Sequence, residues 1–178
     1  ISIDLKTGQQ EEIFNYSPAS ELKNETYIDF KSQSELISYL DDVVGSSVER
    51  HLISDVPVAS LLSGGTDSTL MALYAKERSL KPIEAFTIGF DDSHYDESRI
   101  AEINAKNIGI KHNSFVLNSR DIMNAVSESL TCFSEPFGDP SALVSNLVYK
   151  EVGKSHKVVL SGDGGDELFG GYSRYKLA

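Results

Sequence analysis

The sequence has little cysteine and no long run of apolar residues. Cys132 is the only cysteine among 178 residues, so no disulfide can form within the chain. A reducing compartment, the cytoplasm, is therefore the expected location, and we expect Cys132 to be a buried structural thiol. A membrane-spanning helix needs about 20 consecutive apolar residues. The chain has no such run, so we expect neither a membrane segment nor a signal peptide.

Basic residues are also scarce. Sixteen lysines and arginines stand against 27 aspartates and glutamates, which gives a formal net charge of −11. Nucleic acids and anionic membranes bind basic patches, so we expect neither as a partner. A polyphosphate ligand would have to be held by backbone N–H groups and a metal rather than by a field of lysines.

The remaining composition is that of an ordinary globular domain, with 40% hydrophobic and 24% charged residues. Residues 1–16 predict a hairpin with its turn at 6–9 and its return at Ile13 and Phe14, and residues 17–31 predict a polar linker. Beyond the linker, apolar runs alternate with segments of helical periodicity. The predicted strands are 58–62, 83–90, 111–117 and 157–160, and the predicted helices are 34–53, 66–79, 96–108, 118–132 and one that begins at Pro140.

This alternation predicts an α/β fold with a parallel sheet sandwiched by helices. Asp96 and Asp139 are expected to cap helices, and Gly109 is expected to end one. The predicted helix at 96–108 carries Ile100 and Ile103, and the helix at 118–132 is expected to turn Ile122, Met123, Val126 and Leu130 inward.

A strand–loop–helix segment is the first candidate site. The apolar run 58–62 is followed by Ser63, Gly64, Gly65, Thr66, Asp67 and Ser68. Backbone N–H groups at a helix start lack internal partners and have partial positive charge, so this segment predicts a phosphate-binding loop. No lysine follows the glycines, which excludes the common P-loop. The Asp67 carboxylate would repel a phosphate unless a cation, usually Mg²⁺, lies between the two. The alternative is a glycine turn with Asp67 as a helix N-cap.

A second glycine-rich loop follows the last predicted strand. Residues 161–172 include five glycines and three acids, Asp163, Asp166 and Glu167. The carboxyl ends of parallel strands share one edge of a sheet, so Asp67 and Asp166 are expected to flank one Mg²⁺–pyrophosphate unit. An acidic turn and an adventitious calcium loop are the alternatives.

Together these segments resemble the synthetase domain of the glutamine-dependent asparagine synthases, within the N-type ATP pyrophosphatases. The segment 63–68 is similar to the S-G-G-x-D-S pyrophosphate loop that GMP, NAD and tRNA-lysidine synthetases also have. Segments 160–172, 95–98 and 135–141 are closer to the asparagine synthases themselves. The resemblance covers roughly residues 34–175. It implies an adenine-nucleotide alpha-hydrolase-like, Rossmann-like fold, truncated in this chain.

The resemblance also implies a role for individual residues. The implied ATP contacts are Leu62 and Ile88 at the adenosine, Ser63, Gly64, Gly65, Asp67 and Ser68 in the pyrophosphate loop, and Ser161 and Gly162 in the second loop. Asp67 and Asp166 correspond to Mg²⁺ ligands, and Asp163 to a catalytic acid beside an aspartyl-adenylate. The implied enzyme is a carbon–nitrogen ligase. The side-chain carboxylate of aspartate attacks the α-phosphate of ATP, pyrophosphate leaves, and ammonia displaces AMP to give asparagine.

Some parts of the family pattern differ or are missing. His112 matches a family histidine, but Asn113 follows where a histidine or an acid is common. The glutaminase domain that supplies ammonia from glutamine is absent. Residues 1–31 resemble its trailing edge plus a linker, so residues 32–178 are expected to be an incomplete synthetase domain that is inactive alone. A different acceptor (as in β-lactam synthetase or sugar amidotransferases), a non-catalytic ATP-binding fragment and a homodimer remain open.

Overall fold

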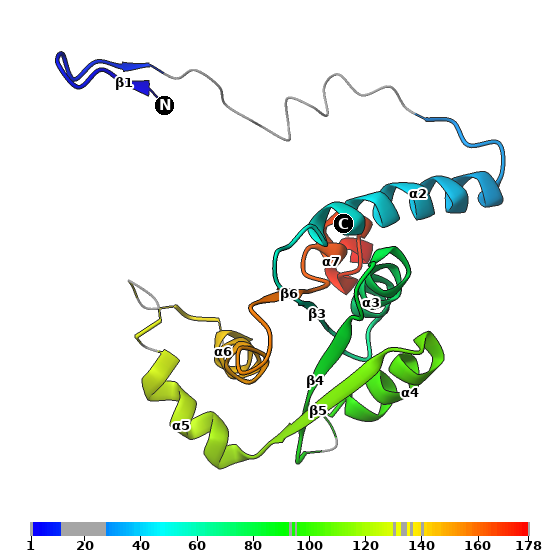
Figure 1. The fold of residues 1–178 in the computed structure, drawn as a ribbon, viewed down its shortest axis with the longest axis vertical. Helices are drawn as coiled ribbons and strands as arrows, with labels where there is room; N and C mark the ends of the chain where they lie inside the picture. The colour runs from blue at the N-terminus through cyan, green and yellow to red at the C-terminus, as the bar shows by residue number, and fades with distance from the viewer. Residues whose placement is uncertain are drawn as a thin grey trace. The chain divides into compact units, whose positions relative to one another are not determined.

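The computed structural model describes residues 2–11, 28–92, 94, 96–129, 131–132, 135, 137–139 and 141–177. Contacts divide the chain into two units, Ile1–Tyr39 and Leu40–Ala178; the boundary near residue 31 stays a prediction. In chain order (Figure 1) the elements are β1 (Ser2–Ile3), β2 (Gln10–Glu11), α2 (Gln33–His51), β3 (Val58–Leu61), α3 (Thr66–Arg78), β4 (Glu84–Phe90), α4 (Ser98–Ile108), β5 (Lys111–Leu117), α5 (Ser119–Ser129), α6 (Ser141–Val152), β6 (Val158–Leu160), α7 (Gly165–Phe169) and the 3₁₀ helix η1 (Ser173–Leu177).

The first unit contains the predicted hairpin, in which β1 pairs antiparallel with β2. The Asp4 carboxylate accepts hydrogen bonds from the N–H groups of Lys6 at 2.8 Å and Thr7 at 3.3 Å. These bonds close the turn and lower the pKa of Asp4. Gly8 ends the turn in the left-handed region, at φ 71°. The return was predicted at residues 13–14, which lie outside the described residues.

The second unit is built on a four-stranded sheet in the order β5-β4-β3-β6. Every neighbouring pair is parallel, which confirms the α/β prediction. Ser60 of β3 pairs with Ala85 of β4 on one side and with Leu160 of β6 on the other. Strands β3, β4 and β5 follow one another outward, whereas β6 returns to the free side of β3. The winding therefore reverses between β3 and β6, where ligand crevices form in open α/β sheets.

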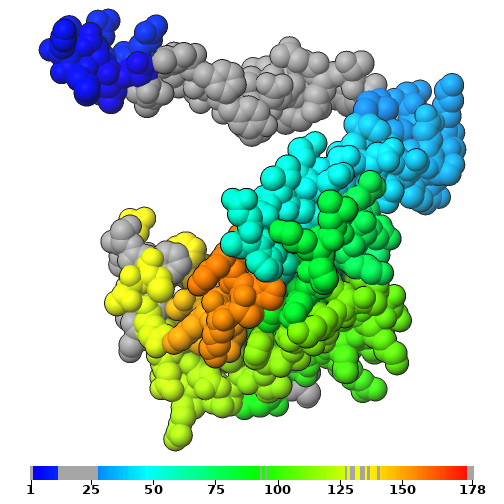
Figure 2. All heavy atoms as spheres, viewed as in Figure 1, coloured from blue at the N-terminus to red at the C-terminus, as the bar shows by residue number. Residues whose placement is uncertain are grey.

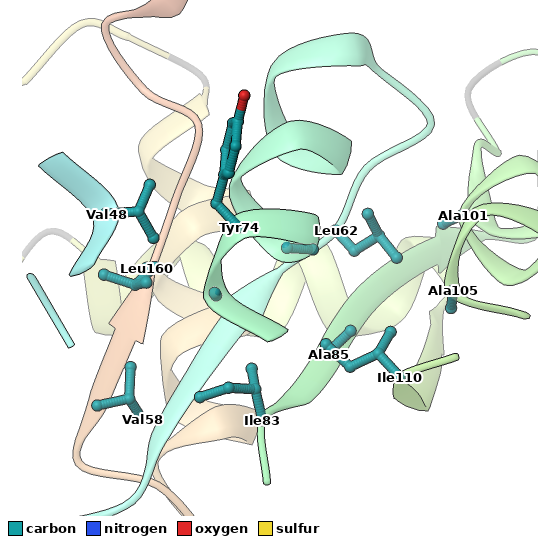
Figure 3. Close-up of a cluster of buried hydrophobic side chains, with 12 residues drawn as sticks. Val48, Val58, Leu62, Tyr74, Ile83, Ala85, Ala101, Ala105, Ile110 and Leu160 are labelled. Atoms are coloured by element: carbon teal, nitrogen blue, oxygen red, sulfur yellow. The ribbon is translucent and has the colours of Figure 1, made fainter. Parts of the chain in front are cut away.

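Helices cover both faces of this sheet (Figure 1). Consecutive strand residues point to opposite faces. Val58 and Leu160 belong to a core shared with α2, α3 and α4 (Figure 3), and Ala59 and Val159 belong to a second core shared with α6. Val48 near the end of α2 lies in the first core with Leu160, and the cyan and orange atoms of these regions touch in the space-filling view (Figure 2). The sheet is thus sandwiched, as predicted.

Gly109 and Asp139 lie at helix ends as predicted, whereas Asp96 stands one residue before Glu97, the N-cap residue of α4. Gly109 ends α4 in the left-handed region at φ 74°. The Asp96 carboxylate accepts a hydrogen bond from the Ser98 N–H at 3.1 Å before α4. The Asp139 carboxylate accepts one from the Ser141 N–H at 2.9 Å at the start of α6. Hydrogen bonds from the side chain and then the N–H of Ser98 lower the pKa of Asp96, and the bond from the Ser141 N–H lowers the pKa of Asp139.

Alanines form the buried faces of α4 and α5, and for α5 this differs from expectation. Ile103 is 52% exposed and Met123 is 70% exposed, whereas Ala101, Ala105 and Ala125 are buried. The prediction that Met123 points inward was therefore wrong. The methyl groups of these alanines face the interior, because the closely packed elements leave no room for larger side chains.

Cys132 is exposed, so the prediction of a buried thiol was also wrong. It follows the end of α5, and its Sγ contacts the carbonyl of Glu128 at 3.5 Å. Leu130, predicted to point inward, lies outside the described residues. Among the residues that the structure describes, no helix has the length and apolar character that crossing a bilayer requires.

Substitutions on α4 test which face is buried. We expect Ala105→Leu to lower the free energy of unfolding by about 1–3 kcal/mol, because a larger side chain must enter a closely packed site. Ile103→Ala should change it by less than about 1 kcal/mol, because Ile103 is half exposed. Urea unfolding of both variants measures the difference. A larger loss from Ile103→Ala would contradict the observed orientation of α4.

Candidate functional site

The two glycine-rich loops line one cavity. The first loop connects β3 to α3 and the second connects β6 to α7, so both lie at the carboxyl ends of adjacent strands. The cavity has a volume of about 570 Å³. Its lining residues are Leu61, Ser63, Gly65, Thr66, Asp67 and Ser68 from the first segment, and Ser161, Gly162, Asp163, Asp166 and Gly171 from the second.

Ser68 holds the first loop in a tight curve. Its buried hydroxyl accepts a hydrogen bond from the Ser63 N–H at 3.0 Å and lies 2.8 Å from the Ser63 hydroxyl. The Ser63 hydroxyl oxygen in turn accepts the N–H of Gly65 at 3.2 Å. The loop backbone thus wraps around the first turn of α3, where unpaired N–H groups and the helix dipole favour an anion.

Two glycines bring the second loop onto this turn. A Cβ atom at Gly162 would lie 2.9 Å from the backbone nitrogen of Ser68, and one at Gly165 would lie 2.5 Å from Oδ2 of Asp67. Both distances are too short for a real side-chain atom. Gly164 between them has φ 93°, a conformation that L residues rarely adopt. Glycine is therefore required here for the contact between the two loops.

Three carboxylates face this cavity. Asp67 lies against Gly165, the side chain of Asp166 lies against Gly171, and Asp163 accepts a hydrogen bond from the Ser161 hydroxyl at 2.9 Å. Among the lining residues that the structure describes, none is a lysine, arginine or histidine. The sequence-predicted metal ligands Asp67 and Asp166 therefore line the same cavity.

A metal ion here would need ligands from outside the chain. Within the described residues there is no group of three or more histidines, cysteines, aspartates or glutamates arranged to hold a metal. Mg²⁺ usually takes only one or two carboxylates and completes its shell with water and phosphate oxygens. The donor set of Asp67 and Asp166 therefore suits a Mg²⁺–phosphate unit.

A second, more apolar cavity adjoins the first. It has a volume of about 250 Å³ and shares Leu61 and Ser63 with the larger cavity. Its other lining residues are Leu62, Phe86, Thr87, Ile88, Phe90, Glu97, Val144 and Val148. The two residues that the resemblance assigns to adenosine, Leu62 and Ile88, thus line the cavity beside the phosphate loop.

Buried polar side chains support the start of the first loop. The Thr87 hydroxyl donates to the carbonyl of Leu62 at 2.5 Å and lies 2.7 Å from Nε2 of His112. Because the single hydroxyl proton of Thr87 goes to the carbonyl, Nε2 of His112 must be the donor to Thr87. Burial lowers the pKa of His112, so the ring is neutral at pH 7. Asn113, where the family pattern differs, donates to Glu84 at 2.9 Å instead.

Gly64 is placed differently from the other predicted loop residues. Its N–H donates to Oε2 of Glu97 at 3.1 Å, and it does not line the larger cavity. No role for Glu97, Thr87 or Gly171 was predicted from the sequence. Glu97 was part of the segment 95–98 that resembles the asparagine synthases, and this was the only signal that could have identified it.

The fold of this chain is similar to the folds of two solved synthetases. The NH₃-dependent NAD synthetase from Campylobacter jejuni subsp. jejuni NCTC 11168 superposes with a TM-score of 0.52 at 18% identity, over 76% of this chain and 60% of that one. The NMN synthetase from Francisella tularensis gives a TM-score of 0.51 at 18% identity, over 83% and 61%. The protein therefore has an α/β fold of the adenine-nucleotide alpha-hydrolase-like class, as predicted.

Sequence comparison identifies the family. Asparagine synthetase 1 (glutamine-hydrolysing) of Bacillus subtilis (strain 168) is 36% identical over 169 residues, which is 92% of this chain. The asparagine synthase family model matches residues 39–178. The chain belongs to the asparagine synthase family. It spans 27% of the length of the Bacillus subtilis relative.

The support beneath the first loop can be tested at Thr87. We expect Thr87→Val to lower the free energy of unfolding by about 2 kcal/mol or more, because the Leu62 carbonyl and the His112 ring lose their partner. Thr87→Ser keeps the hydroxyl and should cost only about 1 kcal/mol, the value of one buried methyl group. Urea unfolding compares the variants. Equal losses would show that the hydroxyl does not hold the loop.

Proposed function

We propose that this chain forms the ATP-binding synthetase part of a glutamine-hydrolysing asparagine synthetase, an ATP-dependent amidotransferase. The chain spans about a quarter of the relative's length, so the reaction belongs to a larger protein. The main support is the larger cavity, which lies at the crevice between β3 and β6. Both glycine-rich loops and three carboxylates line it.

The two adjoining cavities suit the two halves of ATP. The triphosphate would lie between the first loop and Ser161–Gly162, where backbone N–H groups and hydroxyls are available. The adenosine would enter the smaller cavity, where Leu62 and Ile88 offer apolar surface. Ser63 borders both cavities, so it would lie near the junction of the two halves.

Asp67 and Asp166 would hold a Mg²⁺ ion. When bound, the ion neutralises phosphate charge and favours departure of pyrophosphate. Without a cation, three carboxylates in one cavity would repel a polyphosphate. The presence of Asp67, Asp163 and Asp166 in one cavity therefore supports a metal–nucleotide site over a scaffold, because carboxylates without a compensating cation oppose the binding of an anion.

The proposed reaction has two steps. A side-chain carboxylate oxygen of aspartate attacks the α-phosphorus of ATP, the bond to the bridging oxygen breaks, and pyrophosphate leaves with the electron pair. Ammonia then attacks the acyl carbon and AMP leaves, which gives asparagine. Asp163, held by the Ser161 hydroxyl, is the catalytic residue that accepts a proton from the attacking ammonia. The loops act mainly by positioning and charge stabilisation.

We further propose that residues 1–31 are the trailing edge of a glutaminase domain with its linker, and residues 32–178 the synthetase domain. The glutaminase domain would deliver ammonia from glutamine to the cavity. The acidic chain suits a cytoplasmic enzyme that binds neither nucleic acid nor membrane.

The metal ligands provide the direct test. Asp67→Asn and Asp166→Asn should each weaken Mg²⁺-dependent ATP binding by about tenfold or more, by analogy with the cost of disturbing metal-site partners. Isothermal titration calorimetry with and without Mg²⁺ measures this effect. Asp42→Asn, which removes the same charge from an exposed position on α2, serves as the control.

Two results would count against the proposal. One is equal ATP affinity with and without Mg²⁺ in the unaltered protein. The other is a loss of ATP affinity in the Asp42 variant as large as the loss in the site variants. That result would show that the change in net charge alone weakens binding. ATP–pyrophosphate exchange in the full-length enzyme, with aspartate as acceptor, tests the reaction itself.

A further inference from the structure

A carboxylate of the chain itself accepts a hydrogen bond from the backbone of the first loop. Glu97 is the N-cap residue of α4, yet its side chain makes no hydrogen bond to its own helix. Its Oε2 instead accepts the N–H of Gly64 at 3.1 Å, across 33 residues of sequence. This N–H belongs to the loop that would bind the phosphates of a nucleotide. Gly64 itself does not line the larger cavity, but its neighbours Ser63 and Gly65 do, and Glu97 lines the adjoining smaller cavity.

The surrounding packing holds Glu97 near this position. A Cβ atom at Gly64 would lie 3.2 Å from Cβ of Ile100 and 3.4 Å from Cβ of Glu97, so the first turn of α4 packs directly on the loop. Asp96 anchors the same turn through the N–H groups of Ser98 at 3.1 Å and Phe90 at 3.4 Å. The contact therefore follows from backbone packing as well as from a long side chain.

Glu97 differs in charge from the other partners of the loop. The N–H groups of Ser63 and Gly65 are bonded to neutral hydroxyl oxygens of Ser68 and Ser63. A hydroxyl can rotate to donate to a phosphate oxygen, whereas an ionised carboxylate only accepts and repels an anion. Of these three backbone donors, only the Gly64 N–H is bonded to a charged acceptor.

We propose that Glu97 is a specificity-determining residue whose carboxylate competes with anionic ligands for the Gly64 N–H. A ligand must displace this carboxylate before it can use the loop. A single phosphate contacts too little of the cavity to do so, whereas a pyrophosphate unit also reaches the second loop at Ser161–Gly162. The inference rests on the proposed function, because it assumes that the first loop binds the pyrophosphate part of ATP.

Pyrophosphate and inorganic phosphate are the probes for the test, titrated by calorimetry at one Mg²⁺ concentration. Glu97→Gln keeps the shape and an acceptor oxygen but removes the charge. We expect this substitution to raise pyrophosphate affinity by about three- to tenfold, because a hydrogen bond to an exposed charged group contributes only modestly. Inorganic phosphate should gain more than pyrophosphate does, so the preference for pyrophosphate falls. Glu102→Gln, an exposed acid on the same helix, should change neither affinity.

The remaining outcomes distinguish this inference from the proposed function. If the unaltered chain binds pyrophosphate and Glu97→Gln leaves the affinity unchanged or lowers it, Glu97 is not a competitor and the inference fails while the function stands. If Glu102→Gln gives the same gain, the effect is net charge alone. If no variant binds pyrophosphate, the proposed function fails as well. Thermal unfolding of each variant confirms that the compared proteins are folded.

Discussion

The contact between the second glycine loop and the first turn of α3 is the constraint on which the site depends. Gly162 approaches the backbone of Ser68, and Gly165 approaches the side chain of Asp67, so closely that a Cβ atom at either glycine would force its neighbour to move. This contact exists because β6 pairs with β3 rather than extending the sheet beyond β5. A strand added at the other edge would leave the two loops separated by the width of the sheet. The shared cavity therefore follows from strand order.

The acidic character of the chain determines how the first glycine-rich loop could hold a polyphosphate. The chain is acidic, and the described part of the cavity lining has no basic residue, so a polyphosphate would be held by backbone donors, hydroxyls and a metal. Such donors act only when the backbone is held in position. Ser68 holds the loop from within, and Thr87 holds its first carbonyl from β4. Buried, fully paired hydroxyl groups can do this because an unpaired polar group would be costly at the same place.

Much of the fold was predictable because local residue patterns specify it. The predicted strand 111–117 matches β5, the predicted helix 66–79 matches α3 within a residue, and the parallel arrangement is confirmed. The predicted burial was less accurate. Met123 is exposed although it lies in an amphipathic pattern, and Cys132 is exposed although it is apolar. The periodicity of apolar residues shows that a helix has two faces. The distance between the helix and its packing neighbours decides whether alanine or a larger residue fits on the buried face.

The sequence by itself determined the features that depend on neighbouring residues. Gly109 ends α4 in the left-handed region, and Asp139 caps the start of α6, because both effects act over a few residues. Only the tertiary structure decided that Asp67 and Asp166 line the same cavity and that Glu97 bonds to Gly64. These contacts join segments that are 33 or more positions apart. They depend on strand order and helix packing, which no local pattern of residues specifies.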